Sequence, residues 1–284
     1  MSVPPPDITS SANPRIKQLI RLRQRSHRDA AGQMLIEGYR EIQRAHTNQH
    51  PIETLFFCEA LFQGQNNHAL LEALRQSGTR LLHCSKPVFQ KISYRDRPDG
   101  LLALGPQLHH KLDDITLSPS PFLVIAEAIE KPGNLGTILR SADAAGADAV
   151  IVCDRCTDIN NPNVVRASIG TIFCRPVVEA TSEETIAWLR QNGIRSLAAT
   201  PHAKASYTAI DCTGPIAIVV GTEQYGLSPA WMQQADLQVR IPMHGQADSL
   251  NVATATTILL FEVCRQRENL PLNTPPRPAP TATN

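Results

Sequence analysis

The sequence lacks the features that would place it in several familiar protein classes. No charge-free run reaches the roughly 18 apolar residues that a membrane-spanning helix needs, so we expect no membrane partner. The opening MSVPPPDITS has neither the basic nor the apolar region of a signal peptide, which predicts a cytoplasmic protein. No GxGxxG follows an expected strand and no GxxxxGK[ST] occurs, so dinucleotide-binding and P-loop classes have no supporting motif.

The seven cysteines form neither a disulfide framework nor a zinc site. Their number is odd and they are scattered over 284 residues, which favours reduced thiols. Cys153 and Cys156 form a CxxC, but no second pair stands at zinc-site spacing, and the motif follows a strand-like run. His109 and His110 lie in a polar stretch, where adjacent histidines are usually exposed bystanders. We therefore predict no metal.

Charge is distributed unevenly along the chain. Residues 1–110 hold 14 Lys and Arg against 9 Asp and Glu (+5), whereas residues 111–284 hold 13 against 17 (−4). The basic half favours an anionic partner, and no acid lies between Asp7 and Asp29, where a phosphate backbone could satisfy the basic side chains. The candidate RNA contacts are Arg15, Lys17, Arg21, Arg23, Arg25 and Arg28. The alternative is that these residues lie on a basic helix that is exposed to solvent and contacts no RNA.

Hydrophobic periodicity predicts two α/β units joined by a linker. In the first unit we expect strands at 34–36, 54–58, 80–84 and 100–104, and helices at 39–47, 67–76 and 86–92. It holds no constellation of catalytic type, so we predict that it binds a partner. We divide the chain into a basic N-terminal extension (1–30), a binding domain (31–106), a linker (107–120), a second α/β domain (121–268) and a disordered tail (269–284).

The second unit has near-continuous apolar strands such as FLVIA and PIAIVV, which predict a parallel sheet covered by helices on both faces. Expected strands are 122–126, 149–153, 175–178, 195–199, 216–220 and 237–241. Expected helices are 135–145, 162–169, 183–192, 229–234 and 250–267, the last with Ser249 as its N-cap.

Polar side chains follow three of the expected strands. Asn134 lies between two glycines, with Arg140 six residues further on, and Glu223 comes just after a buried strand. Ser249 and Asn251 stand at the start of the last helix. Because carboxyl ends of parallel strands share one edge of the sheet, these groups can converge on a site. For Arg140 the alternative is a structural salt bridge, with Glu127, Glu130 or Asp143 as the partner.

At these residues the sequence shows a family resemblance. The segments NLGTILRSADAAG, IVVGTEQYGLS and IPMHGQADSLNVATATTILLFE closely resemble the three motifs of the SpoU (TrmH-type) RNA ribose 2′-O-methyltransferases of the SPOUT superfamily. The resemblance covers roughly Phe122 to Glu262 and includes NPNVVRASIGTIF between the motifs. The first unit, with MLIEGYREIQRA, is similar to the ribosomal-protein-like substrate-binding domain of the rRNA-directed members.

The resemblance implies an α/β protein in which a small RNA substrate-binding domain precedes a trefoil-knotted, parallel-sheet methyltransferase domain. It implies S-adenosyl-L-methionine as cofactor and a homodimer whose interface lies beside the site. By motif position the implied catalytic residues are Asn134, Arg140, Glu223, Ser249 and Asn251. The residues implied around the cofactor are Gly221, Ile241, Met243 and Leu250, with Thr200 as a further candidate.

The motif-one arginine is often described as the base in this family. Because a guanidinium group stays charged near neutral pH, we expect Arg140 to hold the adjacent phosphate and the developing oxyanion. The proton would then pass to phosphate, to water or to a neutral minority state of Arg140.

We therefore predict an S-adenosylmethionine-dependent RNA 2′-O-methyltransferase that acts on ribosomal RNA. Three alternatives stay open: a non-catalytic RNA-binding or ribosome-assembly factor with the same fold, a tRNA-directed 2′-O-methyltransferase, and an enzyme that uses another nucleotide. The intact set of motif residues counts against the first alternative, and the missing phosphate-binding motif counts against the last.

Overall fold

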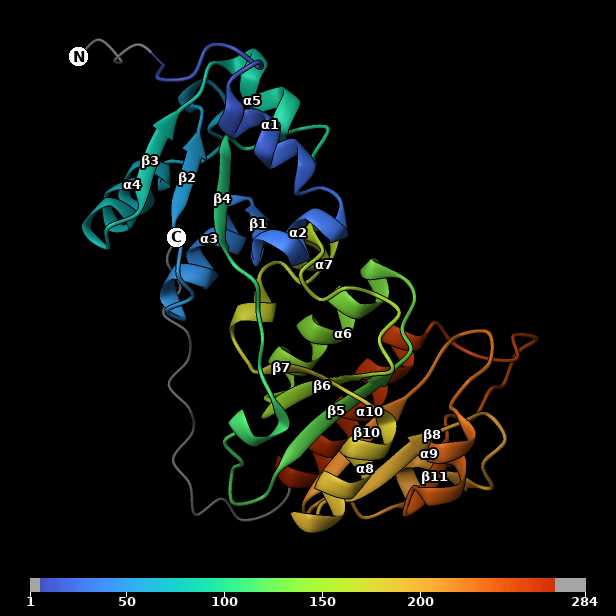
Figure 1. The fold of residues 1–284 in the computed structure, drawn as a ribbon. Helices are drawn as coiled ribbons and strands as arrows, with labels where there is room; N and C mark the ends of the chain where they lie inside the picture. The colour runs from blue at the N-terminus through green and yellow to red at the C-terminus, as the bar shows by residue number, and fades with distance from the viewer. Residues whose placement is uncertain (1–5, 269–284) are drawn as a thin grey trace.

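The computed structural model describes residues 6–268 (Figure 1). These residues form two α/β domains that lie against each other, one on a four-stranded sheet and one on a seven-stranded sheet. The predicted tail, 269–284, and the first five residues lie outside the described residues. Between residues 6 and 268, no helix has the length and apolar character that crossing a membrane requires.

The N-terminal domain has the elements that periodicity predicted, with nearly the same bounds. Its helices are α1 (Pro14–Arg21), α2 (Arg25–Ala31), α3 (Tyr39–Thr47), α4 (Asn67–Gln76) and α5 (Lys86–Ile92). Its strands are β1 (Gln33–Glu37), β2 (Thr54–Phe57), β3 (Arg80–His83) and β4 (Leu101–Pro106), with a 3-10 turn, η1 (Glu59–Leu61). The strand order is β1-β4-β2-β3, in which β4 runs antiparallel to both neighbours and β2 parallel to β3.

Residues 6–30, the described part of the segment predicted as a separate basic extension (1–30), contribute to the core of this domain. Ile16 and Leu19 share one face of α1 because they lie three residues apart, and both belong to the same buried cluster as Phe89 of α5. The basic side chains of α1 occupy the remaining, exposed faces. The amphipathic stripe therefore attaches α1 to the sheet.

The C-terminal domain is built on a sheet in which every strand pair is parallel, as the apolar strands predicted. Its strands are β5 (Phe122–Glu127), β6 (Ala149–Cys153), β7 (Val177–Ala180), β8 (Arg195–Ala199), β9 (Ala205–Ser206), β10 (Ile216–Val220) and β11 (Leu237–Arg240). Its helices are α6 (Pro132–Ala144), α7 (Pro162–Ala167), α8 (Ser182–Gln191), α9 (Pro229–Gln234) and α10 (Val252–Glu268), with 3-10 turns η2 (Leu112–Asp114), η3 (Thr171–Phe173) and η4 (Tyr207–Ala209).

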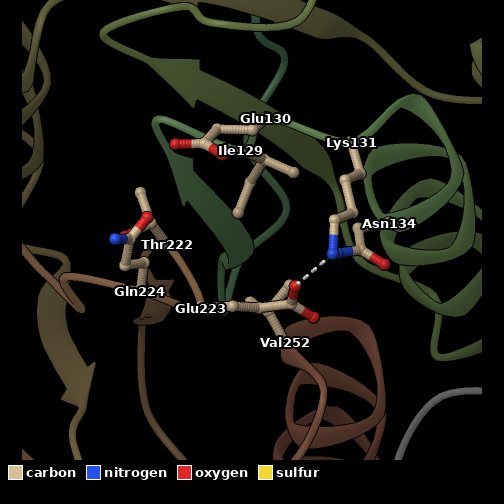
Figure 2. A pocket seen from close by; sticks show the side chains of 8 residues that line it. All are labelled: Ile129, Glu130, Lys131, Asn134, Thr222, Glu223, Gln224 and Val252. Carbon is tan, nitrogen blue, oxygen red and sulfur yellow. Dashed lines mark hydrogen bonds and ion pairs between the residues drawn. The ribbon is translucent and has the colours of Figure 1, made fainter.

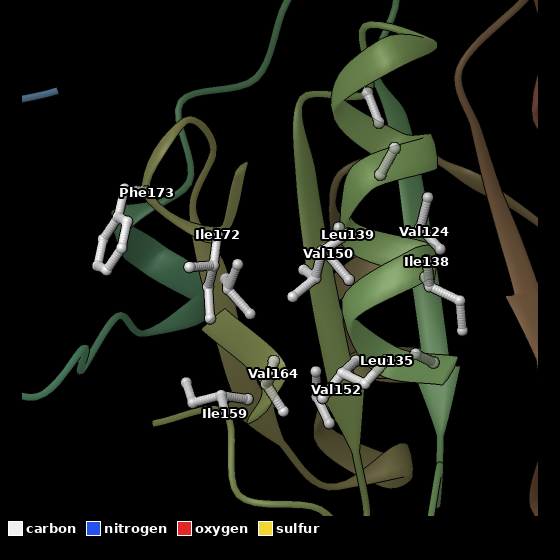
Figure 3. Close-up of a cluster of buried hydrophobic side chains, with 14 of the residues drawn as sticks. Val124, Leu135, Ile138, Leu139, Val150, Val152, Ile159, Val164, Ile172 and Phe173 are labelled. Atoms are coloured by element: carbon white, nitrogen blue, oxygen red, sulfur yellow. The ribbon is translucent and has the colours of Figure 1, made fainter. Parts of the chain in front are cut away.

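The strand order β7-β6-β5-β10-β8-β11-β9 places β5 beside β10 at the point where the chain changes direction across the sheet. One face is covered by α6, α7 and α10, and the other by α8 and α9. Figure 3 shows side chains of α6 packed against those of β5 and β6. Ligands of open parallel sheets bind outside the carboxyl ends of strands at such a switch point. The topology therefore predicts a ligand site at the carboxyl ends of β5 and β10.

Three of the differences from the predicted elements have a local reason. β7 starts at Val177, two residues late, because Pro176 has no N–H to donate to a ladder. α6 starts three residues early at Pro132, since proline suits the first helical position. β9 was not predicted, because two residues are too few to show a period.

The two domains are joined by polar contacts as well as by the linker. Arg28 of α2 donates to Asp158 Oδ2 at 2.5 Å, and both side chains are buried. The backbone N–H of Leu108 donates to Asn160 Oδ1 at 2.8 Å, so the predicted linker is bound at its start. Arg44 of α3 also donates to the carbonyl of Ile169. The segment after β6 thus fixes the N-terminal domain to the parallel sheet.

Candidate active site

Asn251 lies directly before α10 and joins three separate segments of the chain. Its Oδ1 accepts hydrogen bonds from the backbone N–H groups of Ala253 (3.0 Å) and Thr254 (3.4 Å), which caps the helix. Its Nδ2 donates to Asn134 Oδ1 (3.1 Å) and to Glu223 Oε1 (2.5 Å). Both hydrogens of the Asn251 amide are donated, one to Asn134 and one to Glu223. The start of α10 therefore fixes the orientation of these two side chains.

Ser249, which the sequence favoured as N-cap of the last helix, does not cap it. α10 begins at Val252, and the capping oxygen comes from Asn251. Serine and asparagine are both good caps, so residue type could not decide between them. Ser249 is exposed, and its hydroxyl makes no side-chain hydrogen bond within residues 6–268. It is free to meet a ligand.

Asn134 lies in the first turn of α6, after the end of β5. The approach of α6 to α7 depends on Gly136, because a Cβ there would lie 2.4 Å from the Cβ of Ala167. On its other side α6 contacts α10, where the hydroxyls of Ser141 and Thr257 lie 2.7 Å apart. This contact joins α6 to α10, so α6 packs between two other helices of the same face.

Glu223 lies in a tight turn after β10. A Cβ at Gly221 would lie 2.3 Å from the carbonyl oxygen of Gly226, so glycine is needed where the two legs of the turn meet. Lys131 Nζ lies 3.1 Å from Glu223 Oε2, on the side away from Asn251. The hydrogen bond from Lys131 lowers the pKa of Glu223 below its ordinary value of 4.5. Each carboxylate oxygen of Glu223 therefore has its own partner, Asn251 at Oε1 and Lys131 at Oε2.

These side chains border a cavity of about 420 Å³ at the carboxyl ends of β5 and β10 (Figure 2). Figure 2 shows Lys131 and Asn134 on one wall and Glu223 and Gln224 on the opposite one, with the Lys131–Glu223 ion pair between them. The lining residues are Ile129, Glu130, Lys131, Asn134, Thr222, Glu223, Gln224 and Val252. Amide, hydroxyl, ammonium and carboxylate groups together can orient a hydroxyl-bearing ligand.

Arg140 stands apart from this cavity. It is exposed on α6, and it makes no ion pair with any side chain in the described part of the chain. The salt bridges considered as alternatives are not formed, and Glu127 instead accepts from the Ser182 hydroxyl (3.0 Å) and the Ser228 N–H (2.8 Å). Arg140 is a free cation on the surface of the domain.

The residues predicted around the cofactor lie at the same edge of the sheet. Thr200, Gly221 and Ile241 directly follow β8, β10 and β11, which are neighbours in the sheet. The register pairs Val219 with Ala198 and Val239 with Ala199, so the three strand ends lie at about the same level. In the loop before α10, Met243 is exposed and Leu250 is half-buried. None of the five residues lines the cavity itself, but Thr222, which follows Gly221, does.

The basic residues predicted to contact RNA divide into three groups. Arg15, Lys17 and Arg21 are exposed on α1. Arg25 is exposed but pairs with Asp29 at 3.4 Å, and Arg23 donates to the carbonyls at the end of α5. Arg28 is 2% exposed and pairs with Asp158 of the other domain, so its guanidinium is not available to a ligand.

The CxxC does not act as a pair. Burial raises the pKa of Cys153 to about 12, and its thiol lies 3.2 Å from the Thr185 hydroxyl, while Cys156 is exposed. No three His, Cys, Asp or Glu side chains in the described ranges gather closely enough to hold a metal ion.

Sequence reasoning missed Lys131, which lines the cavity and pairs with Glu223. A single lysine after a strand has no period or motif of its own, so only the fold could bring it to Glu223. Its place within EAIEKPGNLG, next to Asn134, was the available signal.

Comparisons with known proteins agree with this arrangement. The model of the SpoU rRNA Methylase family matches residues 121–261, and that of the MRM3-like substrate binding domain matches residues 13–103. The second match begins at Asn13, the N-cap of α1, and so includes the whole of this helix, in line with its packing in the N-terminal core.

Similar proteins cover nearly the whole chain. A 23S rRNA (uridine(2479)-2'-O)-methyltransferase of Streptomyces viridochromogenes is 33% identical over 255 residues, covering 86% of each chain. A solved RNA 2'-O ribose methyltransferase is 44% identical, with a TM-score of 0.82, over 92% of this chain and 99% of that one. An AdoMet-bound rRNA methyltransferase from Sinorhizobium meliloti is 33% identical, with a TM-score of 0.83, over 91% and 97%.

Proposed function

This chain belongs to the SpoU rRNA methylase family, and we infer that it is an S-adenosylmethionine-dependent methyltransferase acting on ribose 2′-hydroxyls of ribosomal RNA. The observation that carries this function is the side chain of Asn251, which joins Asn134 and Glu223 at the sheet's switch point. A non-catalytic relative would have no need to keep this arrangement.

We assign the positioning of the ribose to the cavity. When bound, S-adenosylmethionine supplies an electrophilic methyl group for in-line attack by the 2′-hydroxyl. Asn134 orients that hydroxyl, because its amide lines the cavity, and Asn251 supports it, because Asn251 donates to Asn134 and is itself held at the start of α10. Glu223 anchors Asn251 on one side and Lys131 on the other. Alignment of the reacting atoms to within about 3–3.5 Å supplies much of the rate.

Arg140 and Ser249 complete the site from outside this cavity. Both are exposed, and neither reaches Asn134, Glu223 or Asn251 through a hydrogen bond within residues 6–268. We assign them to a homodimer in which the site lies beside the interface and RNA fills the space between. There Arg140 holds the phosphate next to the reacting ribose and stabilises the developing oxyanion. The proton leaves to phosphate or water, since a guanidinium group keeps its charge.

We assign the adenosyl part of the cofactor to the ends of β8, β10 and β11. Gly221 admits close approach of a ligand to the backbone, and Thr200 and Ile241 lie at the same level on the neighbouring strands. Met243 and Leu250 close this region from the loop before α10. The trefoil knot and a cytoplasmic location stay predictions that go with the family.

The N-terminal domain holds the RNA in this proposal. Arg15, Lys17 and Arg21 supply exposed charge on α1, and Arg25 supplies more on α2. Arg23 shares its donors with the end of α5, so its contribution is smaller. We leave Arg28 out of the RNA surface because it is buried in the domain contact.

Mapping of 2′-O-methyl groups in RNA from cells that lack the protein tests this function. We expect a ribosomal RNA position to lose its methyl group and to regain it when the wild-type gene is restored, but not when the Asn251→Ala variant is supplied. Loss of a transfer RNA methyl group would move the substrate to tRNA. Unchanged methylation, together with calorimetry showing RNA binding without S-adenosylmethionine binding, would favour the assembly-factor alternative.

A further inference from the structure

Tyr225 is the most exposed large hydrophobic residue of the described chain. It is 76% exposed, against 49% for Phe261 and 36% for Met243. Its ring has no aromatic or cation–π partner among residues 6–268. Single exposed hydrophobic residues are common and need no explanation by themselves. The position of Tyr225 is what singles it out.

Tyr225 belongs to the turn that forms one wall of the cavity. Thr222, Glu223 and Gln224 all line the cavity, and consecutive Cα atoms lie only 3.8 Å apart, so Tyr225 lies at the rim. Figure 2 shows Glu223 of this turn extending toward Lys131 on the opposite wall, with Gln224 beside Thr222. The side chain of Lys131 is 71% exposed. An exposed aromatic ring thus follows directly on the residues that line the cavity, opposite an accessible ammonium group.

The turn orders the backbone that carries this ring before any ligand arrives. Thr222 and Gly226 exchange two backbone hydrogen bonds of 3.0 Å, and the backbone N–H of Tyr225 donates to Thr222 Oγ1 at 2.9 Å. Both legs are anchored, since Val220 and Leu227 are buried in the two cores that flank the sheet. Because this backbone is already ordered and a tyrosine side chain has only two rotatable torsions, binding costs Tyr225 little conformational entropy.

We propose that Tyr225 stacks on a base of the substrate RNA, at or next to the methylated nucleotide. Sequence-specific recognition of RNA commonly splays bases out of loops and stacks them on aromatic side chains. A base placed on Tyr225 would bring its sugar to the cavity mouth, where Lys131 can meet the neighbouring phosphate. The inference rests on the proposed function and makes Tyr225 a substrate-positioning residue.

Kinetics of methyl transfer to unmethylated, in vitro transcribed ribosomal RNA tests the proposal. Tyr225→Ala should raise KM for the RNA by about tenfold, the loss expected for one stacked base, with the Kd for S-adenosylmethionine and the Tm unchanged. Tyr225→Phe, which keeps the ring, should restore KM to within about threefold of wild type. A Tyr225→Ala variant with wild-type KM overturns the proposal. A wild-type protein that methylates no RNA instead overturns the proposed function, so the two failures are distinguishable.

Photo-crosslinking shows whether the ring of Tyr225 contacts RNA or a second copy of the chain. A photoreactive phenylalanine at position 225 should attach to the ribosomal RNA, whereas the same residue at position 261, an exposed aromatic site on α10, should not. Attachment of position 225 only to another protein chain, with loss of the dimer in Tyr225→Ala, overturns the proposal.

Discussion

Asn251 has two separable tasks, which can be tested one at a time. Asn251→Ser keeps an N-cap oxygen but removes the amide donor to Asn134 and Glu223. Because Asn134 and Glu223 then lose the donor that orients them, we expect kcat to fall by roughly tenfold or more, while Tm stays near wild type because the cap remains and the two lost hydrogen bonds are exposed. Asn251→Ala should also lose the cap, about 1 kcal/mol, and roughly 2–4 °C of Tm. Full activity in Asn251→Ser would contradict the assignment.

Lys131 sets the acid limit of the site. Because its hydrogen bond lowers the pKa of Glu223 in the folded protein, the pair is fully formed above the unfolded pKa and is lost only as pH falls through the folded one. Lys131→Met removes the largest cause of this shift, so the acid limb of the kcat profile should move up toward the ordinary range of glutamate. Lys131→Arg, which keeps a cation, should restore most of the wild-type limb. Identical profiles for wild type and Lys131→Met would show that Glu223 does not depend on this pair.

At the scale of elements, the close approach of α6 and α7 can be tested with two glycines of the same helix. A Cβ at Gly136 would lie 2.4 Å from that of Ala167, whereas one at Gly133 would meet nothing within 4 Å. Gly136→Ala should therefore cost about 1–3 kcal/mol through overpacking, or several degrees of Tm, and Gly133→Ala should cost nothing. Equal melting temperatures would mean that the helices can separate without penalty.

Helices and strands with a strong period were predictable from sequence, and side-chain partners were not. The bounds of α3, α4 and α5 follow from local spacing, and the parallel sheet follows from its apolar strands. The meeting of Asn134 and Glu223 at one edge also follows from topology. Local pattern could not distinguish Ser249 from Asn251 as the cap, because both suit it.

Contacts between distant segments lay beyond sequence reasoning for the same physical reason. The sequence showed Arg28 as one of six basic residues in the acid-free stretch between Asp7 and Asp29, but its partner Asp158 lies 130 positions along the chain. The motif residues Asn134, Glu223 and Asn251 were nominated by family resemblance, and the structure adds how they bond to one another.

At the scale of the whole molecule, substitutions of Arg28 and Arg21 should affect different properties. The first should weaken the attachment of the two domains, and the second should weaken RNA binding. Removing one partner of a buried ion pair leaves an uncompensated charge, so Arg28→Met should destabilise the protein by roughly 3–5 kcal/mol. The double variant Arg28→Met/Asp158→Leu should recover part of this loss, because no charge is left alone. A single variant as stable as wild type in thermal unfolding would contradict a structural role for the pair.

Arg21→Met is the matched change on the exposed face of α1. It should leave Tm unchanged but weaken RNA binding and reduce the slope of log K against log salt by about 0.7–0.9, the value of one phosphate contact. An unchanged slope would remove Arg21 from the RNA surface.

The most direct test is the chemical position of the transferred methyl group. Wild-type protein incubated with methyl-labelled S-adenosylmethionine and unmethylated ribosomal RNA should place the label in alkali-resistant dinucleotides, because a 2′-O-methyl group blocks cleavage at its own phosphodiester. The Asn251→Ala variant should leave the RNA almost unlabelled. Label recovered on a base, or equal labelling by the variant, would contradict the account.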